Sequence, residues 1–239
     1  MSEPTFIVKI SERTPNGSLT TSSIVQIKNV LQHPGMILLP SDTCYSLAAQ
    51  APFVWAYKTI NTILNRSDIP ISLAFSSFNT VQDYVDLHLI TASLLESFTP
   101  GAITVICACK SKIQTGLQED VVRSTDGTIG IRIPDSIVER EVAACTKFPI
   151  TTVAIRDKDG HIVQNFEQAI DIVSMGAKVI PNFHWAAIEG AQFFHKNSSV
   201  VRVNEKTRQI EMIRDGEISR ENIIAASKKI PEWYYEGWT

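Results

Sequence analysis

The sequence lacks several features that mark special classes of protein. Its 239 residues include only four cysteines, with no CxxC pair and no histidine–cysteine cluster at zinc spacing. Free thiols of this kind are typical of a reducing compartment. No stretch reaches the roughly 18 apolar residues of a membrane-spanning helix, and the polar first residues do not resemble a signal peptide. We therefore expect a cytoplasmic protein with no membrane partner.

An excess of positive charge is also missing. The chain has 22 lysines and arginines against 25 acidic residues, which gives a net charge of −3. This balance argues against broad, non-specific binding of nucleic acid, although a local basic pocket is compatible with it. The Walker A, GxGxxG, GxSxG and HExxH motifs are absent. None of the five histidines has a partner at a readable spacing.

The apolar residues that are present predict alternating strands and helices. This alternation favours an α/β fold with one largely continuous sheet. The first helix is predicted to be capped by Ser22 or Ser23 and to end near Leu31. The predicted strands are residues 6–10, 36–39, 71–75, 103–107, 128–133, 150–155, 199–203 and 209–213, and the later helices are residues 53–64, 89–98, 137–145, 166–173 and 220–229.

One predicted strand runs directly into polar residues. In "GMILLPSDTCYSLAAQ", an apolar run is followed by Ser41, Asp42 and Thr43. Ligands of open α/β sheets bind beyond the carboxyl ends of strands, where short hydroxyls and backbone N–H groups can hold a carboxylate or a phosphate. Alternatively, the three side chains satisfy their own backbone in a turn. Asp42 could equally bind a metal or cap its loop.

Several stretches together resemble the YrdC/YciO family, which includes the threonylcarbamoyl-AMP synthases. "PSDTCYSLAA" resembles the family signature PTDTxYGLxx, and "TIGIRIPDS" resembles TIGxRxPDH. Further matches in the same order are "LNRSDIPISLAF" to KxRP…PL, "TPGAITVIC" to PGPxTxIL, "NSSVVRV" to PSTVVDx and "EMIRDGEI" to xxxRxGxI, while "FPITTVAIRDKDG" occupies the place of PxxxTSANxSG. The matches span roughly residues 6–218, nearly the whole chain.

The resemblance implies both a fold and a reaction. The fold would be a YrdC-like twisted mixed sheet, flanked by helices and containing a deep ligand cleft. Residues 1–218 would form this single domain, and residues 219–239 a C-terminal helix and aromatic tail. The implied reaction condenses threonine, bicarbonate and ATP, with Mg²⁺ bound to the ATP, into threonylcarbamoyl-AMP and pyrophosphate for the t⁶A modification of tRNA. Such a transfer needs cations against the phosphates and fixed donors against a carboxylate.

The resemblance also assigns roles to residues of this chain. It implies catalytic roles for Arg66 and Thr43, and no metal ligands. The implied substrate-binding residues are Ser41, Tyr45, Thr152 and Arg156, and the implied nucleotide-binding residues are Arg132, Ser198, Ser199 and Arg214.

Two motif positions depart from the synthase pattern. Leu64 stands at the lysine of KxR, and Ala154 and Arg156 stand at the Ser-x-Asn pair. These departures resemble the YciO branch of the family. One hypothesis is therefore a divergent synthase in which Arg66, Arg132 and Arg156 supply the missing charge. The alternative is a catalytically impaired protein that binds nucleotide, double-stranded RNA or tRNA. A third is a protein-interaction role for the aromatic tail.

Overall fold

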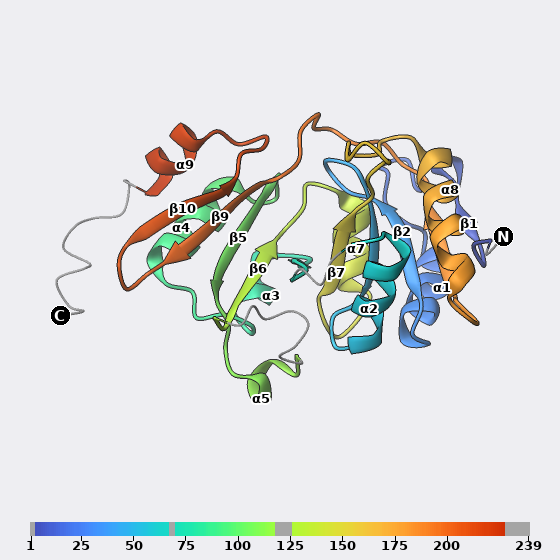
Figure 1. Cartoon of the computed structure of the whole chain (residues 1–239), viewed down its shortest axis with the longest axis horizontal. Coiled ribbons are helices and arrows are strands. Elements are labelled where there is room, and N and C mark those ends of the chain that lie inside the picture. The colour runs from blue at the N-terminus through green and yellow to red at the C-terminus, as the bar shows by residue number, and fades with distance from the viewer. Residues whose placement is uncertain (1–2, 67–69, 118–125, 228–239) are drawn as a thin grey trace.

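A computed structural model describes residues 3–66, 70–117 and 126–227 of the chain (Figure 1). These residues contain one mixed sheet of ten strands in the order β1-β8-β2-β3-β7-β4-β6-β5-β9-β10. The strands are β1 (Ile7–Val8), β2 (Met36–Pro40), β3 (Tyr45–Gln50), β4 (Leu73–Ala74), β5 (Ile103–Ala108), β6 (Thr128–Arg132), β7 (Ile150–Ala154), β8 (Trp185–Ile188), β9 (Ser199–Asn204) and β10 (Gln209–Arg214). The expected α/β fold with a continuous sheet is confirmed.

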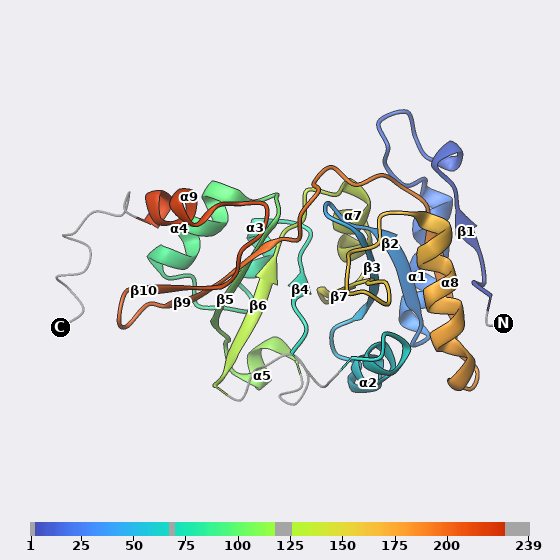
Figure 2. The ribbon, with the colours of Figure 1, turned by 45° about the horizontal axis from the view of Figure 1, so that its top comes forward.

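Helices cover both faces of the part of the sheet that contains β2. Ile37 and Leu39 share an apolar cluster with α1 (Thr21–Gln32) and α7 (Ile137–Ala144). Met36 and Leu38 join the cluster that includes α2 (Val54–Ile63) and α8 (Phe166–Gly176). Because successive side chains of a strand point to opposite faces, the two pairs of helices lie on opposite sides. Figure 2 shows β3 and β7 between α7 and α2.

A second part of the molecule contains β5, β6, β9 and β10 (Figure 1, left). There α4 (Leu89–Phe98) contacts β5 and α9 (Arg220–Ser227). The short strand β4 joins the two parts of the sheet, since it pairs with both β7 and β6. The segment between β8 and β9 also crosses from one part to the other (Figure 1). The remaining short helices are η1 (Ile10–Glu12), α3 (Phe78–Val81), α5 (Lys112–Thr115) and η2 (Ala177–Val179).

The structure corrects several predicted elements. Residues 45–50 and 185–188 are strands that the sequence reading did not predict. The first predicted strand shortens to two residues, because the Lys9 and Ile10 amides bond to Glu12 and Glu189. Thr20, rather than Ser22 or Ser23, caps α1 by accepting a hydrogen bond from an amide. The aromatic tail lies outside the described residues. Within the described ranges, no helix has the length and hydrophobicity needed to cross a bilayer.

The last residue of α8 allows this helix to approach α2 closely. A Cβ atom on Gly176 would lie 2.2 Å from the backbone carbonyl oxygen of Ile63. We expect Gly176→Ala to lower the free energy of unfolding by about 2–3 kcal/mol, because backbone atoms would have to move. Urea unfolding followed by circular dichroism measures this change. The neighbouring exposed residue provides a control, Met175→Ala, expected to stay within about 0.5 kcal/mol of the unchanged chain. Equal stability of the two variants would contradict the prediction.

Candidate functional site: a cationic cleft

A cleft of about 1170 Å³ opens between the two parts of the sheet. The β2–β3 turn, β7 and the end of α2 line one side, and β5, β9 and β10 line the other. It brings together seven of the ten predicted site residues: Thr43, Arg66, Arg132, Thr152, Arg156, Ser198 and Arg214. Residues far apart in the sequence therefore share one surface.

Three arginines, Arg66, Arg156 and Arg214, concentrate positive charge in the cleft. Burial lowers the pKa of Arg66, and the charge of Arg156 lowers it further. Burial and then the charge of Arg156 also lower the pKa of Arg214. Among the described residues, none of the three forms an ion pair with a carboxylate. Like charges that repel one another in a partly buried site are a common property of anion-binding sites.

The segment before β9 holds two of these arginines. The Arg214 guanidinium donates two hydrogen bonds to the Ser198 carbonyl oxygen, of 3.0 and 2.8 Å, and one of 2.9 Å to its hydroxyl. Arg156 donates to the Asn197 side-chain oxygen at 3.3 Å and to the Gly160 carbonyl at 2.6 Å. These bonds leave both positive charges at the cleft without neutralising them.

A β-bulge turns Arg214 toward the cleft. Met212 pairs with Val201, but Arg214, and not Ile213, pairs with Val200, which lines the cleft. In a regular ladder Ile213 would oppose Val200, and Arg214 would point to the other face of the sheet. The extra residue therefore places both Ile213 and Arg214 in the cleft lining.

In the cleft wall, Arg132 forms a buried ion pair with Asp42, which lies behind the lining. Burial alone would lower the pKa of Arg132, but Asp42 and Glu139 outweigh it and raise that pKa. The same Asp42 carboxylate accepts hydrogen bonds from the Ser41 hydroxyl and the Asp135 amide, of 3.1 and 2.9 Å. With both oxygens engaged in this way, Asp42 has a structural role that joins the β2–β3 turn to β6 and to the start of α7.

Three predicted site residues lie outside the cleft lining. Ser41 is buried and bonds Asp42 and Arg132. The Tyr45 hydroxyl donates to the Gly190 carbonyl at 2.6 Å and accepts from its amide at 2.9 Å. Ser199 is fully buried, and its hydroxyl bonds both the amide and the carbonyl of Ile218. The structure therefore places these three side chains in contacts within the protein.

Part of the cleft is apolar. Leu64, at the motif position of the lysine, lines it together with Ile172, Met175 and Val179. Leu64 is half-buried and packs against the main apolar core. The cleft therefore combines a cationic region with an apolar wall, an arrangement suited to a ligand that has both an anionic and an apolar portion.

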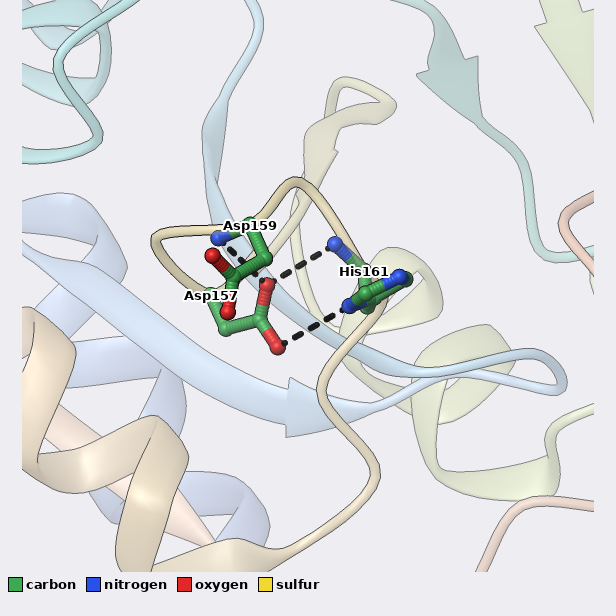
Figure 3. A group of neighbouring side chains, drawn as sticks. All are labelled: Asp157, Asp159 and His161. Carbon is green, nitrogen blue, oxygen red and sulfur yellow. Dashed lines mark hydrogen bonds and ion pairs between the residues drawn. The ribbon is translucent and has the colours of Figure 1, made fainter.

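The loop after β7 contains a close group of Asp157, Asp159 and His161 (Figure 3). One Asp157 oxygen accepts the amides of Asp159 and His161, at 3.0 and 2.9 Å. These amide bonds lower the pKa of the half-buried Asp157, and the bond from His161 has the larger effect. Asp157 thus satisfies its own loop, and the group is explained as a stabilised turn.

Sequence reasoning did not single out several residues around the cleft. Lys158 and Asn197 line it, and Glu139 is buried behind its wall. Lys158 looks like an ordinary loop residue in the sequence. Glu139 stands three residues after Ser136, and this Ser-x-x-Glu spacing predicts only a helix cap. The sequence did point to Asn197, because this residue directly precedes Ser198 and Ser199 in the motif NSSVVRV.

Fold and cleft define a mixed α/β protein with a cationic ligand site between two parts of one sheet. The Sua5/YciO/YrdC family, described as "Telomere recombination", matches residues 29–216, and the chain belongs to this family. A putative threonylcarbamoyl-AMP synthase of Methanocaldococcus jannaschii is 22% identical over 193 residues, which cover 80% of this chain and 84% of that relative. The threonylcarbamoyl-AMP synthase of Bacillus subtilis is 28% identical over 125 residues, covering 49% and 34%.

Solved structures show the same fold. P. abyssi Sua5 in complex with L-threonine has a TM-score of 0.74 and 17% identity, and the match covers 92% of this chain and 60% of that one. E. coli YciO has a TM-score of 0.73 and 16% identity, and the match covers 92% of this chain and 99% of that one. The chain thus matches YciO over nearly its whole length and only about three fifths of Sua5.

We expect the buried ion pair to be essential for stability. Arg132→Met would leave Asp42 buried without its cation, and breaking such a pair costs about 3–5 kcal/mol. Urea unfolding measures the loss. The control is Arg140→Met, because Arg140 pairs with the exposed Asp135 at 3.5 Å and exposed pairs contribute up to about 1 kcal/mol. An Arg132→Met protein as stable as the control would refute this role.

The charge of Arg214 can be tested separately from the bulge. Deleting Ile213 would restore a regular ladder in which Arg214 follows Met212 directly and still opposes Val200, on the cleft side of the sheet. We therefore expect the deletion to retain the binding of inorganic triphosphate, and Arg214→Ala to weaken it by about 10- to 100-fold, since this variant removes one charged contact. Ile213→Ala keeps the residue count and should also retain affinity. Calorimetric titration compares the variants, and unchanged binding by Arg214→Ala would disprove the role of this arginine.

Proposed function

We propose that this chain synthesises threonylcarbamoyl-AMP from threonine, bicarbonate and ATP and releases pyrophosphate, in support of the t⁶A modification of tRNA. The observation that carries the proposal is the group of Arg66, Arg156 and Arg214, which share a cleft without carboxylate partners among the described residues. The names of the two curated relatives support the reaction, and the threonine named in the Sua5 structure supports the substrate.

The cationic region suits the triphosphate of ATP. A bound anion would relieve the repulsion that Arg156 exerts on Arg66 and Arg214. The planar guanidinium groups can donate paired hydrogen bonds to phosphate oxygens. In the transition state, where negative charge builds up on the phosphates, the same cations would stabilise it. Arg156 thereby supplies a positive charge in a cleft where Leu64 replaces the lysine of the family motif.

The described cleft lining fits a magnesium ion that arrives with the nucleotide. Asp157 is the one acidic residue in this lining, and its loop amides already engage it. Mg²⁺ commonly retains water and binds substrate phosphates rather than a full set of protein ligands. The phosphates would then hold the ion, which neutralises their charge, while the arginines orient them.

The inner wall suits the amino acid. Thr43 and Thr152 line the cleft and are buried, with exposed fractions of 2% and 8%. Their hydroxyls can bond the polar groups of a small substrate, and the buried surroundings strengthen such bonds. Threonine bound here would lie beside the cationic region, so that its carbamate could reach the α-phosphate without a protein nucleophile.

The test is pyrophosphate release from MgATP by the purified chain, with and without threonine and bicarbonate. We expect release that requires both. Arg66→Ala and Arg156→Ala should each lower the rate by about 10²–10³, the usual cost of one transition-state contact. Arg220→Ala, at the exposed start of α9 and outside the cleft lining, is the matched control and should leave the rate unchanged.

The same assay separates the two main hypotheses. Absence of threonine-dependent release would overturn the proposed reaction. Measured ATP binding without release would then favour the impaired nucleotide-binding protein. Affinity for a tRNA or a double-stranded RNA, measured against salt concentration, would show whether phosphates of a nucleic acid occupy the cleft.

A further inference from the structure

Glu139 is a buried carboxylate that the fold does not explain. It is fully buried, and neither of its side-chain oxygens has a hydrogen-bond partner among the described residues. It occupies the third position of α7, where the capping spacing would direct it back to the Ser136 amide. Ser136 does cap the helix, accepting the Glu139 amide at 3.2 Å. The Glu139 carboxylate itself points elsewhere, and an unpaired buried carboxylate is costly.

A second orphaned polar group lies next to this carboxylate. The hydroxyls of Ser41 and Thr152 are close enough to favour the ionised form of Glu139, although neither makes a hydrogen bond of full geometry with it. The Ser41 hydroxyl is already engaged with Asp42. The Thr152 hydroxyl has no described partner, and Thr152 lines the cleft. Thr152 therefore connects the cleft surface to Glu139.

Three titratable groups on two neighbouring elements face Glu139. Arg132 from β6 favours its ionised form, and Asp42 from the β2–β3 turn opposes it. The charge of Glu139 also raises the pKa of the Cys44 thiol on the same turn. Burial is the largest effect and raises the pKa of Glu139 above its ordinary value. A carboxylate with a raised pKa is a stronger base than an exposed one.

We propose that Glu139 accepts a proton, through the Thr152 hydroxyl, from the amino group of the substrate bound in the cleft. The inference rests on the proposed function, because that reaction needs a neutral amine. The ammonium group gives a proton to the Thr152 oxygen, while the hydroxyl proton passes to a Glu139 oxygen. The amine gains its free electron pair, Thr152 ends as a hydroxyl, and Glu139 ends as a neutral acid. Glu139 acts through Thr152 and is a positioning residue.

The test is the pH dependence of threonine-dependent pyrophosphate release at saturating ATP. In the unchanged chain the rate should rise as Glu139 ionises and then level off. Glu139→Gln keeps the size and shape of the side chain, but the amide cannot accept a proton. We expect its rate to fall by about 10²-fold at neutral pH. Its rate should then climb about tenfold per pH unit, since only free amine from solution can react.

Two further comparisons separate the relay from a structural effect. Thr152→Val should reproduce the pH profile of Glu139→Gln, and Thr152→Ser, which keeps the hydroxyl, should restore the original profile. Glu141→Gln is the control on the same helix, because Glu141 accepts the Leu19 amide at 2.7 Å and lies outside the cleft lining. Thr152→Val changes one buried group only, so it decides the question if Glu139→Gln does not fold.

The outcomes for the relay and for the reaction are distinct. Threonine-dependent release with unaltered pH profiles in Glu139→Gln and Thr152→Val would overturn the relay and leave the proposed function standing. A lower rate at every pH with an unchanged profile would likewise show that Glu139 is only structural. No threonine-dependent release from the unchanged chain would overturn the proposed function and the relay together.

Discussion

The buried ion pair between Arg132 and Asp42 connects the elements that form the cleft. Arg132 ends β6, and Asp42 lies in the β2–β3 turn. The Asp42 side chain also bonds the start of α7, and its carbonyl oxygen accepts the amides of Phe193 and Phe194, both at 3.0 Å. The segment between β8 and β9 is thereby tied to the same point. Asp42 is not in the cleft lining, and it thus connects four parts of the chain around the site.

The charges of the molecule are distributed in two different ways. In the Arg132–Asp42 pair, positive charge is matched by a carboxylate, and the pair contributes to the fold. In the cleft, Arg156 repels both Arg66 and Arg214, and none of the three forms an ion pair with a described carboxylate. Such an arrangement lowers stability until an anion binds, and binding to the folded state then stabilises it. A net charge of −3 conceals this local excess.

Sequence patterns predicted most of the fold, and seven of the ten predicted site residues line the cleft. Strand β2 could be predicted because Met36–Leu39 is a continuous apolar run. Strands β3 and β8 were missed for physical reasons: both are buried throughout, so neither alternates, and polar or short segments obscure their ends. Motif order located Arg66 and Arg214, but spacing alone could not show that Ser199 and Tyr45 point into the protein. Glu139 carried only a helix-capping signal, since its environment comes from tertiary packing.

The pairing of β2 with β8 also constrains how the chain can fold during synthesis. Met36 pairs with Trp185 in a parallel arrangement, and β1 in turn pairs with β8 on its other side. Until residues 185–188 have left the ribosome, β2 has an open edge and β1 has no strand to join. Long-range parallel pairing of this kind forms slowly, and an open apolar strand invites aggregation. The first half of the nascent chain therefore exposes an unpaired apolar strand edge for as long as the second half is being made.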